Sequence, residues 1–109
     1  MATIQKQLAC QLQRFNFIKK TYKKVVKTGL FQLRPLRRYS RQEVVVKIEL
    51  LRSTWNDFAD LHKEICNSKT NSDEALTYFE QCPYENCMKY YSKALSQLLT
   101  MQESYINRS

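Results

Sequence analysis

The chain has 109 residues, a formal net charge of +8, one Gly, two Pro and four Cys. This length suits a single domain with a modest core, and so few turn-forming residues exclude a fold of many short strands. No apolar run approaches the ~18 residues of a membrane span, and no secretory signal stands at the N-terminus, so we expect reduced thiols and a cytoplasmic or nuclear location.

Basic residues are concentrated in the first half of the chain. Residues 1–52 hold 13 Lys and Arg against two acidic residues, whereas residues 53–109 hold five against eight. Such a basic half favours an anionic partner, such as nucleic acid or a lipid surface. The two oppositely charged halves could also attract one copy of the chain to another. The alternative is a solvated basic surface with no dedicated partner.

Residues 1–29 predict a basic amphipathic helix. Its apolar positions keep heptad spacing, with Gln11 as the one polar member, and Thr28-Gly29 predicts where it ends. Lysines crowd the other face, where like charges destabilise a helix unless packing or an anion offsets the repulsion. The apolar positions are Ile4, Leu8, Phe15, Ile18, Tyr22 and Val25.

Residues 30–39 predict a connector, because Pro35 interrupts any helix. Several of its residues are apolar, so we expect the segment to pack against the domain. Arg34, Arg37 and Arg38, followed by Arg41, form a second basic cluster.

Residues 40–67 predict the central helix, around which the rest of the chain is organised. Ser40 followed by Glu43 has the spacing of a capping box, which marks a helix start. Apolar residues then recur at alternating steps of four and three, which places them in one stripe on one face. The stripe consists of Val44, Ile48, Leu51, Trp55, Phe58, His62 and Ile65.

Residues 72–106 predict a third helix, capped by Asn71 or Ser72 and kinked near Pro83, where the alternative is that the helix restarts. We expect Ala75, Leu76 and Phe79 to face inward before the kink. After the kink the predicted inner stripe is Met88, Tyr91, Leu95, Leu98 and Tyr105, flanked by Cys87, Ala94 and Met101.

Together these elements predict an all-α fold, a single domain of residues 1–109 built as an antiparallel bundle of three long helices. Heptads this regular could also pair between chains, so a dimer that shares helices is the alternative architecture.

The basic first half supplies the candidate nucleic-acid site, because Lys and Arg contact phosphates and provide affinity rather than sequence recognition. The first helix also suits a membrane surface, or a calmodulin-type partner with Ile18, Val25 and Phe31 as anchors. The predicted phosphate contacts are Lys19, Lys20, Lys23, Lys24, Lys27, Arg34, Arg37, Arg38 and Arg41.

Two further residue sets have a structural and a functional interpretation. His62, Cys66, Cys82 and Cys87 could hold a tetrahedral zinc ion, although their spacing favours a seam histidine and buried thiols instead. The tyrosines could stack on bases, but their helical spacing favours a core position with the hydroxyl in water. They are Tyr78, Tyr84, Tyr90, Tyr91 and Tyr105.

Ser40 is a candidate phosphorylation site, because Arg37-Arg38-Tyr39-Ser40 resembles the acceptor pattern of basophilic kinases. A phosphate at Ser40 would meet a helix N-terminus and neutralise part of the arginine cluster. The sequence has one His, no Gly-rich phosphate loop and no nucleophile spaced beside a base. We therefore expect no enzymatic activity and no cofactor.

The stretch from Val44 to Met101 resembles the helical N-terminal Gag region of insect LTR retrotransposons of the BEL/Pao kind. The resemblance consists of core-type residues at helical steps and covers about half of the chain. These residues are Leu51, Trp55, Phe58, His62, Tyr78, Phe79, Tyr84, Tyr91, Ala94 and Leu98.

The resemblance implies a Gag-like protein that self-associates into particles and gathers RNA. Unlike a full Gag, the chain has no Cys/His zinc knuckle and no protease, so any RNA contact must come from the basic half. The sequence thus predicts a non-enzymatic self-association module, a homo-oligomer that binds nucleic acid, RNA above all. The alternative is a protein-interaction or membrane-surface adaptor that uses the first helix.

Overall fold

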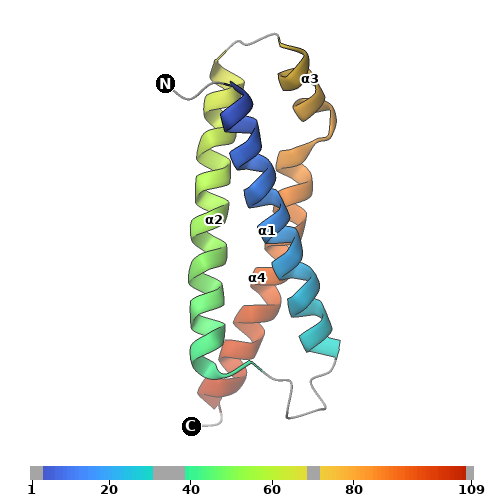
Figure 1. Ribbon diagram of the computed structural model, residues 1–109. Helices are drawn as coiled ribbons and strands as arrows, with labels where there is room; N and C mark the ends of the chain where they lie inside the picture. The colour runs from blue at the N-terminus through green and yellow to red at the C-terminus, as the bar shows by residue number, and fades with distance from the viewer. Residues whose placement is uncertain (1–3, 31–38, 69–71, 108–109) are drawn as a thin grey trace.

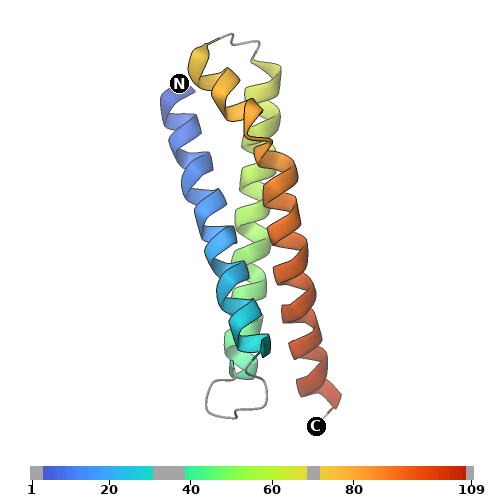
Figure 2. The ribbon, with the colours of Figure 1, turned by 90° about the vertical axis from the view of Figure 1, so that its right-hand side faces the viewer.

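A computed structural model describes residues 4–30, 39–68 and 72–107. It contains the helices α1 (Ile4–Leu30), α2 (Arg41–Asn67), α3 (Asp73–Glu80) and α4 (Pro83–Asn107), with no strand in the described residues. The fold class predicted from the sequence, all-α, is therefore confirmed. The chain forms a rod of 53 × 21 × 17 Å in which α1 and α4 run in one direction and α2 in the other (Figures 1 and 2).

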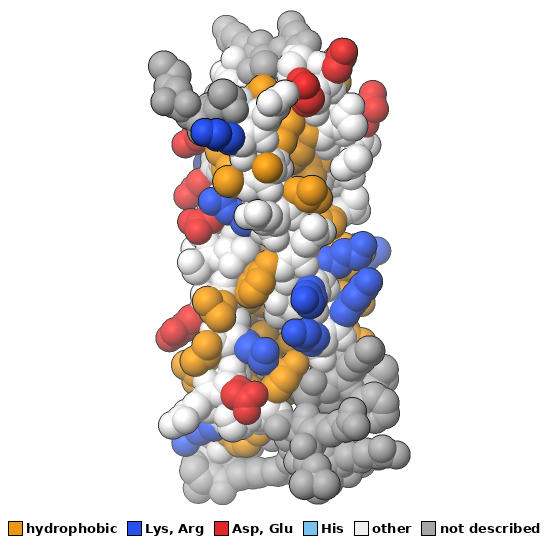
Figure 3. Space-filling view, viewed as in Figure 1, with side chains coloured by type: hydrophobic (Ala, Val, Ile, Leu, Met, Phe, Trp, Pro, Cys, Tyr) orange, Lys and Arg blue, Asp and Glu red, His pale blue; other side chains and the backbone are white. Residues whose placement is uncertain are grey.

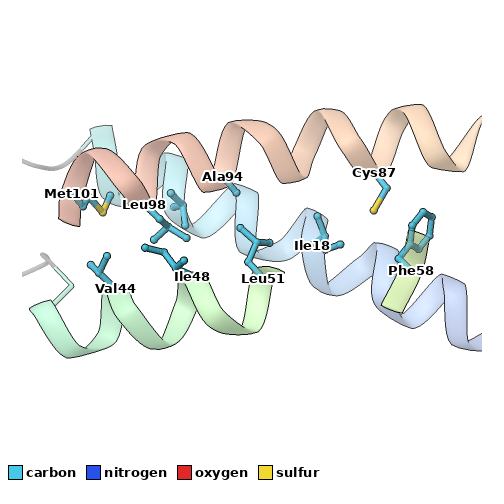
Figure 4. Close-up of a cluster of buried hydrophobic side chains, with 10 residues drawn as sticks. Ile18, Val44, Ile48, Leu51, Phe58, Cys87, Ala94, Leu98 and Met101 are labelled. Atoms are coloured by element: carbon cyan, nitrogen blue, oxygen red, sulfur yellow. The ribbon is translucent and has the colours of Figure 1, made fainter. Parts of the chain in front are cut away.

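The core is formed by the three long helices of one chain, each of which contacts the other two. The apolar stripe of α2 lies inside, as predicted: Val44, Leu51 and Phe58 are fully buried. Side chains from α1 and α4 close over this stripe (Figure 4). The heptad seams are thus satisfied within one chain, without a second copy. The other core residues are Ile18, Val25, Ile48, Cys87, Ala94, Leu98 and Met101.

The start of α2 is fixed by the predicted capping box. Glu43 N donates to Ser40 Oγ at 3.1 Å, and Ser40 N donates to Glu43 Oε1 at 3.3 Å. Each contact pairs a backbone donor that the first turn of a helix leaves unsatisfied. Ser72 caps α3 through its side chain only, because its Oγ accepts from Ala75 N at 3.2 Å.

The inner stripe of α4 begins one residue earlier than predicted, at Cys87 instead of Met88. Met88 is 40% exposed, whereas its neighbour Cys87 is fully buried. Cys87, Ala94 and Met101 form the innermost line of α4, and the residues we expected to flank the stripe are therefore at its centre. Leu76 of α3, which we expected to face inward, is 52% exposed.

Residues 72–106 do not form one kinked helix, because α3 ends at Glu80 and α4 begins at Pro83. Between them Cys82 has φ of 49°, a left-handed conformation that is unfavourable for a residue other than glycine. Proline disfavours the α conformation of the residue before it and donates no hydrogen bond, so the chain breaks here instead of bending.

The predicted end of α1 at Thr28-Gly29 was also wrong, because the helix continues through Leu30. Glycine is tolerated inside a helix, at a cost in backbone entropy, and its presence did not determine the end. The rest of the predicted connector, residues 31–38, lies outside the described residues, together with Arg34, Arg37 and Arg38.

Candidate nucleic-acid interface

Four lysines occupy two successive turns on the outer side of α1. Their position follows from the packing of this helix, because Ile18 and Val25 are fully buried and leave the intervening residues at the surface. Three of the four are exposed, and the first is half-buried. Figure 3 shows blue side chains over the middle and lower part of this face. The four residues are Lys19, Lys20, Lys23 and Lys24.

A groove between α1 and α2 brings a further lysine to this surface. Lys20 and Lys24 from α1 meet Lys47 from α2 across it. Three lysines therefore line one cavity, together with two apolar residues and one threonine. The groove has a volume of about 230 Å³ and is lined by Phe17, Lys20, Thr21, Lys24, Lys47 and Leu50.

Aromatic rings support two of the lysines. The Nζ atom of Lys47 lies 4.7 Å from the ring centroid of Tyr39, and the backbone carbonyl of Tyr39 accepts a hydrogen bond from the hydroxyl of Tyr105. On the other side of α1, Lys19 Nζ lies 5.9 Å from the ring centroid of Tyr90 in α4. These rings attract the cations through their π faces and reduce the freedom of the side chains.

A second groove, between α1 and α4, extends the basic surface on its other side. Its one charged lining residue is Lys93, and its hydroxyl and amide groups can also contact an anion. The groove measures about 410 Å³ and is lined by Tyr22, Val26, Ser92, Lys93, Ser96 and Gln97.

The opposite end of the rod, near α3, carries acidic residues. Asp73 and Glu74 occupy the first turn of α3, where the helix dipole favours them. Asp60 and Glu85 line a pocket of about 380 Å³ near His62. The charge asymmetry of the sequence thus becomes an asymmetry along the rod.

The structure brings together part of the predicted phosphate-binding set. Lys19, Lys20, Lys23 and Lys24 form one surface on α1, and Arg41 is exposed at the start of α2. The side chains of Lys27, Arg34, Arg37 and Arg38 lie outside what the structure describes. Sequence reasoning missed Lys47 and Lys93, because heptad spacing does not show which outer residues border a neighbouring helix.

The structure does not bring the candidate zinc ligands together. Cys66 and Cys82 are exposed, whereas Cys87 is buried in the core, where burial raises the pKa of its thiol to about 12. Across residues 4–30, 39–68 and 72–107, no three His, Cys, Asp or Glu side chains are arranged to hold a metal ion. His62 has another partner, since its Nδ1 lies 2.7 Å from the hydroxyl of Tyr78.

That contact belongs to a buried polar network that links three helices. Gln11, 1% exposed, donates from Nε2 to the backbone carbonyl of Phe58 at 2.9 Å and to the Tyr78 hydroxyl at 3.1 Å. Arg14 in turn donates to Gln11 Oε1 at 3.2 Å. The seam histidine is thus bonded to a tyrosine, and the polar heptad member Gln11 has a structural role.

The network affects the protonation of two of its members. Burial lowers the pKa of His62, and the nearby carboxylate of Glu85 opposes this shift. Burial also raises the pKa of Tyr78 to about 12. A neutral His62 that accepts at Nδ1 from the Tyr78 hydroxyl satisfies both groups, because Gln11 Nε2 donates to the same hydroxyl oxygen.

The anchors of a calmodulin-type contact are not available to a partner. Ile18 and Val25 are fully buried within the bundle, and Phe31 lies outside the described residues. The tyrosines considered for base stacking are half-buried, and most of them pack against the core. Among the described helices, none combines the length and the apolarity needed to cross a bilayer.

Comparison of the chain with protein-family models, with curated proteins and with solved structures finds no match. The candidate interface is therefore defined by the geometry of α1, α2 and α4. Its main chemical feature is the groove where Lys20, Lys24 and Lys47 meet.

Proposed function

We propose that the chain is a non-enzymatic helical module that binds the phosphate backbone of nucleic acid, RNA above all, through its basic half. The observation that carries the proposal is the groove in which Lys20, Lys24 and Lys47 converge from two helices. Ammonium groups bind phosphates as compact charges, and several of them along one surface suit a polyanion.

The cost of placing these lysines together supports a ligand over a merely solvated surface. Lys20 and Lys24 lie one turn apart on α1, a spacing at which like charges destabilise a helix by up to about 0.5 kcal/mol per pair. Lys47 adds a third charge from the neighbouring helix. A bound polyanion would turn this repulsion into attraction.

The module is also proposed to self-associate, as the resemblance to Gag implies. Because the heptad seams are closed within one chain, self-association would use the outer surface. The lysine cluster at residues 19–24 of α1 and the acidic residues near α3 lie toward opposite ends of the rod, which favours contact between unlike ends of two copies. The four unpaired cysteines suit the reducing cytoplasm or nucleus.

A membrane-surface adaptor is the alternative function. An interfacial helix inserts its apolar face into the lipid, but Ile18 and Val25 on the apolar face of α1 are buried in the core. Membrane binding by α1 would therefore depend on its lysines or on opening of the bundle. The buried apolar face favours the nucleic-acid proposal.

The salt dependence of binding tests the proposal. We would titrate a labelled single-stranded RNA with the protein at increasing salt and compare the slope for wild type and Lys20→Gln/Lys24→Gln. Each lost phosphate contact should reduce the slope by about one. Lys63→Gln, an exposed lysine near the acidic end, is the matched control and should leave the slope unchanged. Equal slopes for the three proteins would contradict phosphate binding at this groove.

Molecular mass in solution, measured with and without RNA, tests self-association. We expect a mass above that of one chain at low salt, a decrease as salt screens the unlike ends, and an increase when RNA is added. A single-chain mass under all of these conditions would contradict self-association. Binding to anionic vesicles that persists at high salt would instead favour the membrane alternative.

A further inference from the structure

Two exposed apolar side chains lie in the groove beside the lysines. Phe17 from α1 is 40% exposed and Leu50 from α2 is 50% exposed, and both line the cavity that Lys20, Lys24 and Lys47 surround. Within the described residues, the Phe17 ring contacts no other aromatic ring. Its neighbour Phe15, by contrast, packs edge-on against Tyr90 at a centroid distance of 6.0 Å.

This combination restricts the chemistry of the occupant. A simple polyanion is recognised by the lysines and obtains nothing from an exposed aromatic ring. The groove instead suits a ligand in which a flat apolar group stands next to a negative charge. A nucleotide of an unpaired strand has this composition, because its base presents a π face beside the phosphate.

We propose that the groove between α1 and α2 binds single-stranded nucleic acid, with an unpaired base against Phe17 and Leu50 and the neighbouring phosphates on Lys20, Lys24 and Lys47. The inference rests on the proposed function and adds the form of nucleic acid that the site prefers. In a duplex the bases stack on one another, and their faces are not accessible to a side chain. The site therefore discriminates against double strands.

The positions of the residues along α1 fit this arrangement. Phe17, Lys20 and Lys24 fall on one face at successive turns, separated by about 4.5 Å and then about 6 Å along the axis, since an α-helix rises about 1.5 Å per residue. Thr21, between them, donates its hydroxyl to the backbone carbonyl of Phe17 at 2.8 Å. The ring at one end of the row and the cations beyond it can thus contact consecutive parts of one strand.

The experiment compares three labelled ligands by fluorescence anisotropy. They are an unstructured RNA of about 12 nucleotides, an abasic oligomer with the same number of phosphates, and a duplex of the same length. Wild type should bind the single strand about tenfold more tightly than the abasic oligomer, which is within the range measured for aromatic stacking on one base. The duplex should bind with an affinity close to that of the abasic oligomer.

Variants of Phe17 assign this difference to the groove. Phe17→Ala should remove the preference for bases while binding the abasic oligomer as wild type does, and Phe17→Trp should keep the preference. Leu12→Ala removes another exposed apolar side chain of α1, away from the groove, and should bind all three ligands as wild type does. Circular dichroism and thermal unfolding of each variant would confirm that the bundle is intact.

The outcomes separate the two proposals. Equal affinity for the single strand and the abasic oligomer, combined with a loss of affinity in Lys20→Gln/Lys24→Gln, would retain phosphate binding and overturn the base contact. Binding of all three ligands that does not depend on the lysines would overturn the proposed function itself. If Phe17→Ala weakened binding to phosphatidylserine vesicles and left RNA affinity unchanged, the groove would bind lipid and the inference would be wrong.

Discussion

Gln11 and Tyr78 meet across 67 positions of sequence, where Gln11 Nε2 donates to the tyrosine hydroxyl at 3.1 Å. The same hydroxyl lies 2.7 Å from Nδ1 of His62 in α2. One amide and one phenol thus connect α1, α2 and α3. Helix α3 has only eight residues, too few to be stable in isolation, so this polar contact and the burial of Ala75 hold it against the bundle.

We predict that Gln11→Leu lowers the free energy of unfolding by about 1–2 kcal/mol, because it removes the three hydrogen bonds of this side chain while preserving volume. Urea denaturation monitored by circular dichroism measures the change. Tyr78→Phe should have a similar effect, and the double variant should be less destabilised than the two single effects added together, because both act on one contact. Fully additive effects would show that the two groups do not interact in solution.

We predict that the protein becomes less stable when the pH falls below 6.5, the ordinary pKa of a histidine. Burial lowers the pKa of His62 from its ordinary 6.5, so the unfolded chain takes up a proton more readily than the folded chain. The contribution of neutral His62 is complete above 6.5 and is lost as the pH falls through this value toward the folded pKa. The melting temperature between about pH 7.5 and pH 5 measures the effect.

His62→Gln is the comparison protein for this experiment, because glutamine does not titrate. It should be less stable than wild type at neutral pH, and its melting temperature should change less over the same range. If the two melting curves shifted in parallel, His62 would not be the group responsible.

We predict that Trp55→Ala lowers the free energy of unfolding by about 2 kcal/mol, less than for a fully buried tryptophan. Trp55 is half-buried and stacks on Tyr91 with a centroid distance of 5.0 Å and an interplanar angle of 10°. Val46→Ala, at a position 51% exposed on the same helix, should change stability by less than about 0.5 kcal/mol. Equal effects of the two substitutions in chemical denaturation would contradict a packing role for Trp55.

We predict that Ser40→Ala lowers stability by about 1 kcal/mol, because the amide of Glu43 loses its acceptor. Ser40→Asp should restore most of the loss, since aspartate also caps helices. Thermal unfolding of the three proteins measures both effects. An unchanged melting temperature in Ser40→Ala would show that water replaces the cap at no cost.

We also predict that a negative charge at Ser40 weakens binding of nucleic acid, as phosphorylation at this exposed residue would. Ser40→Glu should reduce both the affinity for single-stranded RNA and its salt slope, because the added charge opposes the basic half of the chain. Ser40→Gln controls for size. The same affinity and slope in Ser40→Glu and wild type would exclude a charge switch at this site.

Local signals in the sequence predicted the helical elements well. The box of Ser40 and Glu43 fixed the start of α2, and the steps of four and three predicted that Val44, Leu51 and Phe58 would be buried. These features depend on residues within two turns of one another, so the sequence contains all of the information that they require. The α4 stripe shows the limit, because Cys87 and Met88 are both apolar and only packing distinguishes them.

Features that join distant parts of the chain could not be predicted. Nothing near Gln11 in the sequence indicates that Tyr78 accepts its hydrogen bond. Lys47 appeared as an ordinary surface residue of α2, and its place beside Lys20 and Lys24 depends on the rotation of one helix against another. The sequence therefore predicted the part of the candidate site that α1 contributes. The part that α2 contributes, Lys47, could be identified only from the structure.

The exposed cysteines are suitable sites for attaching a fluorescent label. Cys10, Cys66 and Cys82 are exposed, whereas Cys87 is buried and resists alkylation. Cys66 is in the last turn of α2, and Cys82 stands between α3 and α4. Along α1, Cys10 lies about 15 Å from Lys20, at about 1.5 Å per residue. A maleimide dye would thus attach away from the lysine groove, and the native thiols can report on docking without obstructing it.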